Sequence, residues 1–144
     1  MGEREESIVR EFIKEWECEG SWDEAQIDRI LSRVAPDGHY HVYAWKRPMT
    51  GRAEIRAEMV RQVSVFANYR CEVKTIVSTD RTVLLERIDF QTMGQQLQTP
   101  VTVHAAAAFE VDADGMIAAW RDYFDMKEVE AQFGAGTSAA GSPA

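Results

Sequence analysis

Metal-ligating, nucleotide-binding and serine-nucleophile motifs are all missing from this sequence. Among its 144 residues there are 2 cysteines and 3 histidines, and none of them stand at the spacing of a zinc site. No Gly-rich phosphate loop and no Gly-x-Ser-x-Gly elbow occur. These absences exclude the zinc, nucleotide-binding and serine-hydrolase classes that such motifs define.

Positive charge and long apolar runs are scarce as well. The chain has 16 Lys and Arg against 24 Asp and Glu, a net charge of −8, which argues against binding to nucleic acid or to an anionic membrane surface. No apolar run approaches the length of a transmembrane helix. The acidic stretch Glu3–Glu6 is unlike a targeting segment, so we expect a cytoplasmic protein in which Cys18 and Cys71 are reduced thiols.

What remains is the composition of an ordinary globular protein. Hydrophobic residues make up 45% and charged residues 28% of the chain, and this length suits one domain with its own core. The periodic patterns lie within residues 1–133, where we expect a single domain. Residues 134–144 are rich in Gly, Ala and Ser and are predicted to be a disordered tail.

Apolar residues recur at helical spacing in the first half of the chain. Ser21 and Glu24 fit a capping box, with Ser21 as the N-cap of the second predicted helix. Gly51 opens the third. The inward stripes are Ile8, Phe12, Ile13 and Trp16, then Ile27, Ile30, Leu31 and Val34, and finally Ile55, Met59, Val63 and Phe66.

The remaining patterns are typical of strands. A turn at 36–38 precedes a strand at His39–Trp45, and from Tyr69 onward the apolar period is two. Further strands are expected at Thr82–Thr92, Val101–Val111 and Met116–Phe124, and a short helix at Met126–Phe133. Helices segregated from a mostly antiparallel sheet define the α+β class.

Three charged residues stand where strand alternation predicts an inner face. They are Arg87, Asp89 and Asp122, and a buried carboxylate is costly unless a partner neutralises it. Their neighbours on these faces are Val83 and Leu85 on one strand and Trp120 and Phe124 on the other. If both faces point inward in one sheet, Arg87 lies between the two aspartates. Such a group has a net charge of about −1 and can share one proton, so its carboxylates can act as acid and base.

Two features of the strands bear on partners and on substrate. Opposite Arg87 the outer face carries Leu84, Ile88 and Phe90. A sheet that is apolar on both faces needs cover on both, so we expect a homodimer. On the next strand Val103 and Ala105 share one face, and small side chains there indicate either room for a bulky substrate or plain alanine-rich packing.

The strings ERID, at residues 86–89, and WRDYFD, at residues 120–125, carry a family resemblance. In this order they resemble the limonene-1,2-epoxide hydrolase family, within the nuclear-transport-factor-2-like (NTF2-like) and SnoaL-like superfamily, over roughly residues 8–133. The resemblance implies a curved, mixed, mostly antiparallel sheet that forms a cone-shaped cavity with three helices. It also implies that no metal and no cofactor take part.

By this resemblance the protein adds water to an epoxide in one step and gives a vicinal diol. Asp122 corresponds to the general base on water, Asp89 to the general acid toward the epoxide oxygen, and Arg87 to the bridge between them. A single displacement needs both proton transfers, on opposite sides of the bond. We expect a small apolar epoxide-like substrate in a pocket formed by Val42, Leu85, Val103, Ala105, Trp120 and Phe124.

One position departs from the family pattern. The family holds its water with a tyrosine and, two residues later, an asparagine on the first strand. Tyr40 matches the tyrosine, but Val42 stands where the asparagine is expected, and valine cannot form a side-chain hydrogen bond. The departure favours, as the alternative, a SnoaL-like cyclase or isomerase acting on a polycyclic or polyketide intermediate. A third hypothesis, independent of Val42, is a non-catalytic small-molecule binding or dimerisation module.

Overall fold

Four helices and six strands build the fold in this computed structural model, which describes residues 2–45, 47–94 and 96–139. In chain order they are α1 Glu3–Glu15, α2 Glu24–Ser32, β1 Val34–Val42, the 3-10 turn η1 Tyr43–Trp45, β2 Arg47–Thr50, α3 Arg52–Val63, β3 Phe66–Thr79, β4 Thr82–Met93, β5 Thr99–Val111, β6 Ile117–Phe124 and α4 Met126–Ala139. This order confirms the predicted α+β class.

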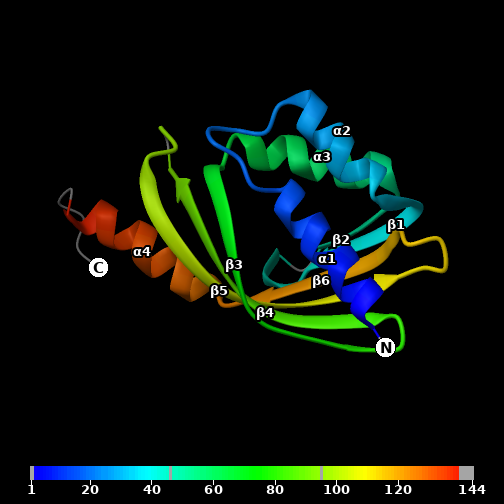
Figure 1. Ribbon diagram of the computed structural model, residues 1–144. Coiled ribbons are helices and arrows are strands. Elements are labelled where there is room, and N and C mark those ends of the chain that lie inside the picture. Colours follow the sequence, from blue (N-terminus) through cyan, green and yellow to red (C-terminus); the bar gives the residue numbers. More distant parts are fainter. Residues whose placement is uncertain (1, 46, 95, 140–144) are drawn as a thin grey trace.

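The six strands form one mixed sheet in the order β2-β1-β6-β5-β4-β3. β1 and β6 are parallel, and the other neighbours are antiparallel. Figure 1 shows the long strands bending strongly, with α1, α2 and α3 gathered on the concave side and α4 beside the far end of β5. The helices and the bent sheet therefore enclose the interior, as the family resemblance implies.

An aromatic cluster packs α1 against β6 inside the sheet's curve. Phe12 of α1 is buried, and its ring centroid lies 5.2 Å from that of Trp120 and 5.8 Å from that of Trp16, both edge to face. Such contacts stabilise by about 0.5–1.5 kcal/mol each beyond the burial of the rings. The cluster fixes Trp120 within β6, two residues before Asp122.

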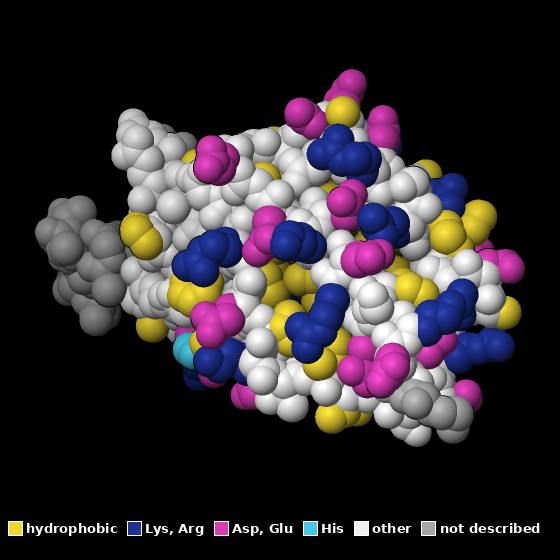
Figure 2. Space-filling model, viewed as in Figure 1, with side chains coloured by type: hydrophobic (Ala, Val, Ile, Leu, Met, Phe, Trp, Pro, Cys, Tyr) yellow, Lys and Arg dark blue, Asp and Glu magenta, His cyan; other side chains and the backbone are white. Residues whose placement is uncertain are grey.

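Charged side chains of both signs cover the helical face. Figure 2 shows acidic and basic groups interspersed there, and several are paired, among them Arg61 with Glu58 and Arg56 with Asp28. Exposed pairs contribute about 0–1 kcal/mol each, so the stability of the fold comes mainly from its core. None of the helices among the described residues is long and apolar enough to cross a membrane.

The predicted N-cap of the second helix is wrong. The N-cap of α2 is Asp23, whose side chain accepts a hydrogen bond from the Gln26 N–H, and not Ser21. Aspartate and serine cap about equally well, and the burial of Trp22 against the ring of Phe66 selects the later start.

The turn expected at 36–38 is part of β1 instead. The pairing of β1 with β6 shifts register between Val34 and His39, so the extra residues form an irregularity within a continuous strand. Gly38 permits this, because a Cβ there would stand 2.5 Å from the Val34 side chain. β1 ends at Val42, where η1 turns the chain back into β2.

The last helix is longer than expected, and its side chains bond the first part of β5, which has no strand neighbour on the β6 side. α4 continues past Phe133 over part of the predicted tail, and residues 140–144 lie outside the described residues. β6 pairs with β5 only from Ala105 onward. Before that point Glu128 accepts from the His104 N–H at 2.7 Å, and Gln132 accepts from the Thr102 N–H at 2.8 Å. These side chains satisfy backbone groups that would otherwise lack partners.

Candidate active site

β5 brings the three inner charged residues together without contributing a charge itself. β4 and β6 both pair with β5, so that Arg87 stands opposite Ala105 and Asp122 stands opposite Ala107. Both alanines are buried, and their methyl groups leave space for the Arg87 side chain to cross from β4 to β6. The small side chains of β5 thus make room for an ion-pair bridge.

Arg87 bridges the two aspartates directly. Its Nε lies 2.9 Å from Asp89 Oδ1 and 3.1 Å from Oδ2, and its Nη1 lies 3.0 Å from Asp122 Oδ1. All three residues are buried, with 7–8% of their surface exposed. The structure therefore places the predicted acid, bridge and base in one continuous chain of hydrogen bonds.

Each aspartate also accepts a hydrogen bond from a tyrosine, Asp122 from one that is buried and Asp89 from one that is partly buried. Tyr40 donates to Asp122 Oδ2 at 3.2 Å, and Tyr69 donates to Asp89 Oδ1 at 2.6 Å. Burial, and then the negative charge of Asp122, raise the pKa of Tyr40 well above its usual value. Burial and the charge of Asp89 do the same to the pKa of Tyr69. Both phenols therefore remain protonated donors at neutral pH.

The bridge keeps its positive charge inside the protein. Burial lowers the pKa of Arg87, but the negative charges of Asp122 and Asp89 outweigh that effect and hold the pKa well above its usual value. A guanidinium with two carboxylates has a net charge of about −1 when both are ionised and is neutral when they share one proton. The group can therefore give a proton on one side and take one on the other.

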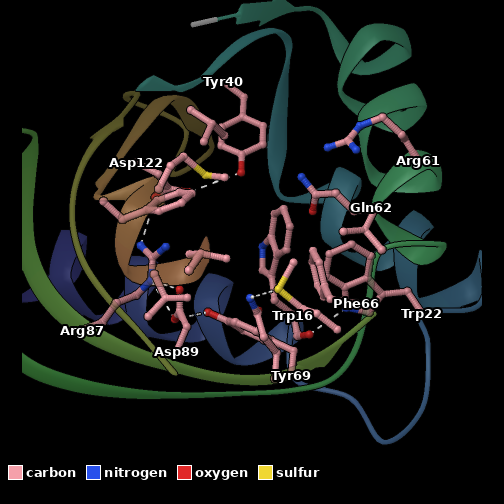
Figure 3. A pocket seen from close by; sticks show the side chains of 18 residues that line it. Trp16, Trp22, Tyr40, Arg61, Gln62, Phe66, Tyr69, Arg87, Asp89 and Asp122 are labelled. Atoms are coloured by element: carbon pink, nitrogen blue, oxygen red, sulfur yellow. Dashed lines mark hydrogen bonds and ion pairs between the residues drawn. The ribbon is translucent and has the colours of Figure 1, made fainter. Parts of the chain in front are cut away.

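A cavity of about 210 Å³ opens onto this group. Figure 3 shows Arg87, Asp89 and Asp122 on one side of it, with the rings of Trp22 and Phe66 across from them. The remaining lining is mostly apolar and comes from most of the helices and strands. It includes Trp16, Val42, Val65, Met93, Val103, Phe124, Met126 and Val129. The site can therefore hold an apolar molecule against an acid and a base.

Residues 9–120 match the SnoaL-like domain family. The chain belongs to this family. The match confirms the superfamily that the ERID and WRDYFD strings predict. No curated protein matches the sequence.

Solved structures of low identity share the fold of this SnoaL-like domain. An LEH-like epoxide hydrolase from M. tuberculosis superposes with a TM-score of 0.74 at 22% identity, over 95% of this chain and 94% of that one. A candidate SnoaL-like polyketide cyclase from Shewanella putrefaciens CN-32 gives 0.77 at 12% identity, over 92% and 97%. A protein with a ketosteroid isomerase-like fold from Catenulispora acidiphila DSM 44928 gives 0.72 at 22%, over 86% and 92%. These likenesses establish the fold alone.

The residues predicted to form the pocket divide into three groups in the SnoaL-like domain. Val42, Val103 and Phe124 line the main cavity. Trp120 lines a smaller cavity of about 40 Å³ on another side of Asp122. Leu85 and Ala105 are buried but line neither cavity, and Leu85 belongs to the hydrophobic core.

Several residues that line the cavity were not predicted from the sequence. For two of them, the periodicity of the sequence could have indicated an inward position. Tyr69 begins the alternation of β3 on the same face as Cys71, which the pattern places inward. Gln62 stands three residues after Met59 and seven after Ile55, so helical periodicity puts its amide on the inward stripe of α3. A polar residue on an apolar stripe indicates either a buried hydrogen bond or a site.

Cys71 adds little nucleophilic chemistry to the SnoaL-like domain. It pairs with Asp89 across β3 and β4, and burial, followed by the charge of Asp89, raises the pKa of its thiol from 9.0 to about 12. A thiol is a weak nucleophile when protonated. Among the described residues, no three His, Cys, Asp or Glu side chains are grouped so as to hold a metal ion. The carboxylates and tyrosines are the groups suited to proton transfer.

Proposed function

We propose that this protein is a cofactor-independent epoxide hydrolase that adds water to an epoxide in one step. The observation that supports it most is the Asp89–Arg87–Asp122 bridge on the wall of a mostly apolar cavity. The shared fold with the LEH-like epoxide hydrolase of M. tuberculosis is compatible with this activity. An acid and a base held by one arginine can act on the same small molecule.

Asp122 is the general base in this proposal. Its Oδ1 is held by Arg87, while its Oδ2 accepts from Tyr40, and Oδ2 is the oxygen that we assign to the attacking water. Asp122 takes a proton from water as the water oxygen attacks an epoxide carbon. Such a base typically contributes about 10²–10⁴-fold to the rate.

Asp89 is the general acid. Arg87 Nε donates to both of its oxygens, whereas Tyr69 donates to Oδ1 alone, so Oδ2 accepts fewer hydrogen bonds and is, in this proposal, the oxygen that carries the transferable proton. That proton goes to the epoxide oxygen as its C–O bond breaks, so no free alkoxide forms. Asp89 loses one proton while Asp122 gains one, and the bridged group stays neutral from beginning to end.

The experiment that tests this function is diol formation from a small panel of epoxides. Limonene oxide, cyclohexene oxide and styrene oxide suit the apolar lining, and in H₂¹⁸O one labelled oxygen is expected in each diol, because the oxygen comes from water and not from a carboxylate. Mass spectrometry after a single turnover distinguishes the two sources. A folded protein that forms no diol from any of them contradicts the proposal.

A cyclase or isomerase is the second candidate, and Val42 is the observation that favours it. Val42 is buried directly beside Asp122 in the pairing of β1 with β6 and offers the base no water-binding group. The candidate polyketide cyclase of S. putrefaciens has the same fold. This reading predicts rearrangement of a polycyclic or polyketide intermediate with no oxygen taken from water.

We further propose a homodimer through the outer face of the sheet. Leu84 is 46% exposed there and Tyr123 is 42% exposed, its ring stacked on that of Tyr43. A second copy offers the same apolar patch in return. Sedimentation is expected to give a species of twice 16.3 kDa, and Leu84→Glu to shift it toward the monomer. A single 16.3 kDa species of the unmodified protein at micromolar concentration is the opposing result.

A further inference from the structure

One buried amide in the cavity has no role in the proton chain described above. Gln62 of α3 is only 3% exposed and lines the cavity. Figure 3 shows its amide and the Tyr40 hydroxyl both directed into the cavity. Buried side-chain amides usually have their hydrogen-bonding groups matched, so the question is which atom of this amide can serve a polar molecule in the cavity.

The orientation of the Gln62 amide is set by its neighbour one turn earlier. Gln62 Nε2 donates to Glu58 Oε2 at 2.9 Å, and Arg61 holds the same carboxylate with bonds of 2.6 and 3.0 Å. A carboxylate only accepts hydrogen bonds, so it must face the nitrogen of the amide. The other hydrogen of the nitrogen is directed toward Tyr40, so the carbonyl oxygen, Oε1, is the amide atom left to accept a hydrogen bond from a molecule in the cavity.

Gln62 also faces the base across the cavity, with Tyr40 between them. Its amide acts as a donor toward the Tyr40 oxygen, and this lowers the pKa of the phenol, against the larger raising effects of burial and Asp122. Tyr40 is itself held rigidly, with its ring stacked on Trp120 at 4.3 Å. Tyr40, Asp122 and Gln62 thus surround one volume of the cavity.

We propose that Gln62 is a positioning residue that holds the attacking water between Asp122 and Tyr40, an inference that rests on the proposed hydrolase. The water donates one hydrogen to Asp122 Oδ2 and the other to Gln62 Oε1, which turns its lone pair toward the substrate. One O–H bond breaks and its proton passes to Asp122. The new C–O bond forms at the epoxide carbon, and the ring oxygen takes the proton of Asp89.

Gln62→Met tests this, because it keeps the length of the side chain without an acceptor oxygen. The kcat for diol formation is expected to fall by up to about tenfold, the value of one hydrogen bond to a reacting group, with little change in KM. Adding Val42→Asn is expected to restore most of the loss, because residue 42 is the register neighbour of Asp122. An amide across the cavity cannot repair a purely structural defect in α3.

Gln26→Leu is the matched control. Gln26 is also a buried glutamine on a helix, but its amide binds the carbonyls of Glu15 and Glu17 and does not line the cavity. We expect it to lower the melting temperature and leave kcat per folded molecule unchanged. Where Gln62→Met does not fold, Gln62→Leu takes its place in the same experiment.

The possible outcomes distinguish a failure of the proposed role of Gln62 from a failure of the proposed hydrolase activity. If the unmodified protein forms no diol, the hydrolase proposal and this inference fall together. If it forms diol and folded Gln62→Met keeps the full kcat, the role of Gln62 alone is overturned. A loss of kcat that Val42→Asn does not restore in a folded double variant also overturns it, because the defect is then structural.

Discussion

Asp122→Asn is expected to lower diol formation by about 10²–10⁴-fold, the usual contribution of a general base. Asparagine has the shape of aspartate, and its carbonyl oxygen can still accept the 3.0 Å hydrogen bond from Arg87 Nη1. An amide cannot take a proton from water at neutral pH. The variant therefore removes the base while it keeps the cavity and most of its contacts.

The WRDYFD string provides a matched control for this variant. Asp125 is exposed, lies outside the cavity and accepts from the Lys127 N–H at the start of α4. Asp125→Asn keeps a side-chain oxygen for that contact, and full activity is expected. Initial rates of diol release, with melting temperatures as the check on folding, decide the matter. If Asp122→Asn keeps more than about a tenth of the turnover, Asp122 is not the base.

Residues of the bridge could be predicted from the sequence because strand alternation is a strict local rule. A period of two assigns Arg87, Asp89 and Asp122 to inner faces, and the cost of burying charge then requires that they meet. The sequence did not reveal that Tyr69 would reach Asp89. That contact depends on how β3 lies along β4, where the register shifts twice, and such irregularities have no clear local signature.

The curvature of the sheet was equally beyond local reasoning. Leu85 shares a strand face with Arg87, but the bend turns it into the core under α1, while Val129 of α4 reaches the cavity from the far end. A face can be assigned from periodicity, whereas a place in a cavity depends on the three-dimensional path of the strand. Helix starts are ambiguous for another reason, since Ser21 and Asp23 are both good N-caps.

Arg87→Ala is expected to damage stability and activity together. It leaves Asp89 and Asp122 facing each other in a buried site with no cation between them. Removing one member of a buried charged network typically costs about 3–5 kcal/mol, a large share of the stability of a domain this size. Urea unfolding measures this loss as a lower midpoint with an unchanged slope.

Arg121→Ala is the control that separates a buried bridge from an exposed ion pair. Arg121 immediately precedes Asp122 on β6 but points to the outer face, where it pairs with Glu110. An exposed pair of this kind contributes about 0–1 kcal/mol, so only a small shift of the urea midpoint is expected.

The activity of Arg87→Ala must fall by more than its unfolded fraction explains. Arg87 Nε holds both oxygens of Asp89, and its Nη1 holds Oδ1 of Asp122. Without Arg87 the acid and the base lose their relative orientation, which catalysis by positioned groups requires. Measuring kcat at a temperature where the variant is fully folded separates the two effects. A variant with an unchanged urea midpoint and full turnover would show that the bridge neither holds the fold together nor serves the reaction.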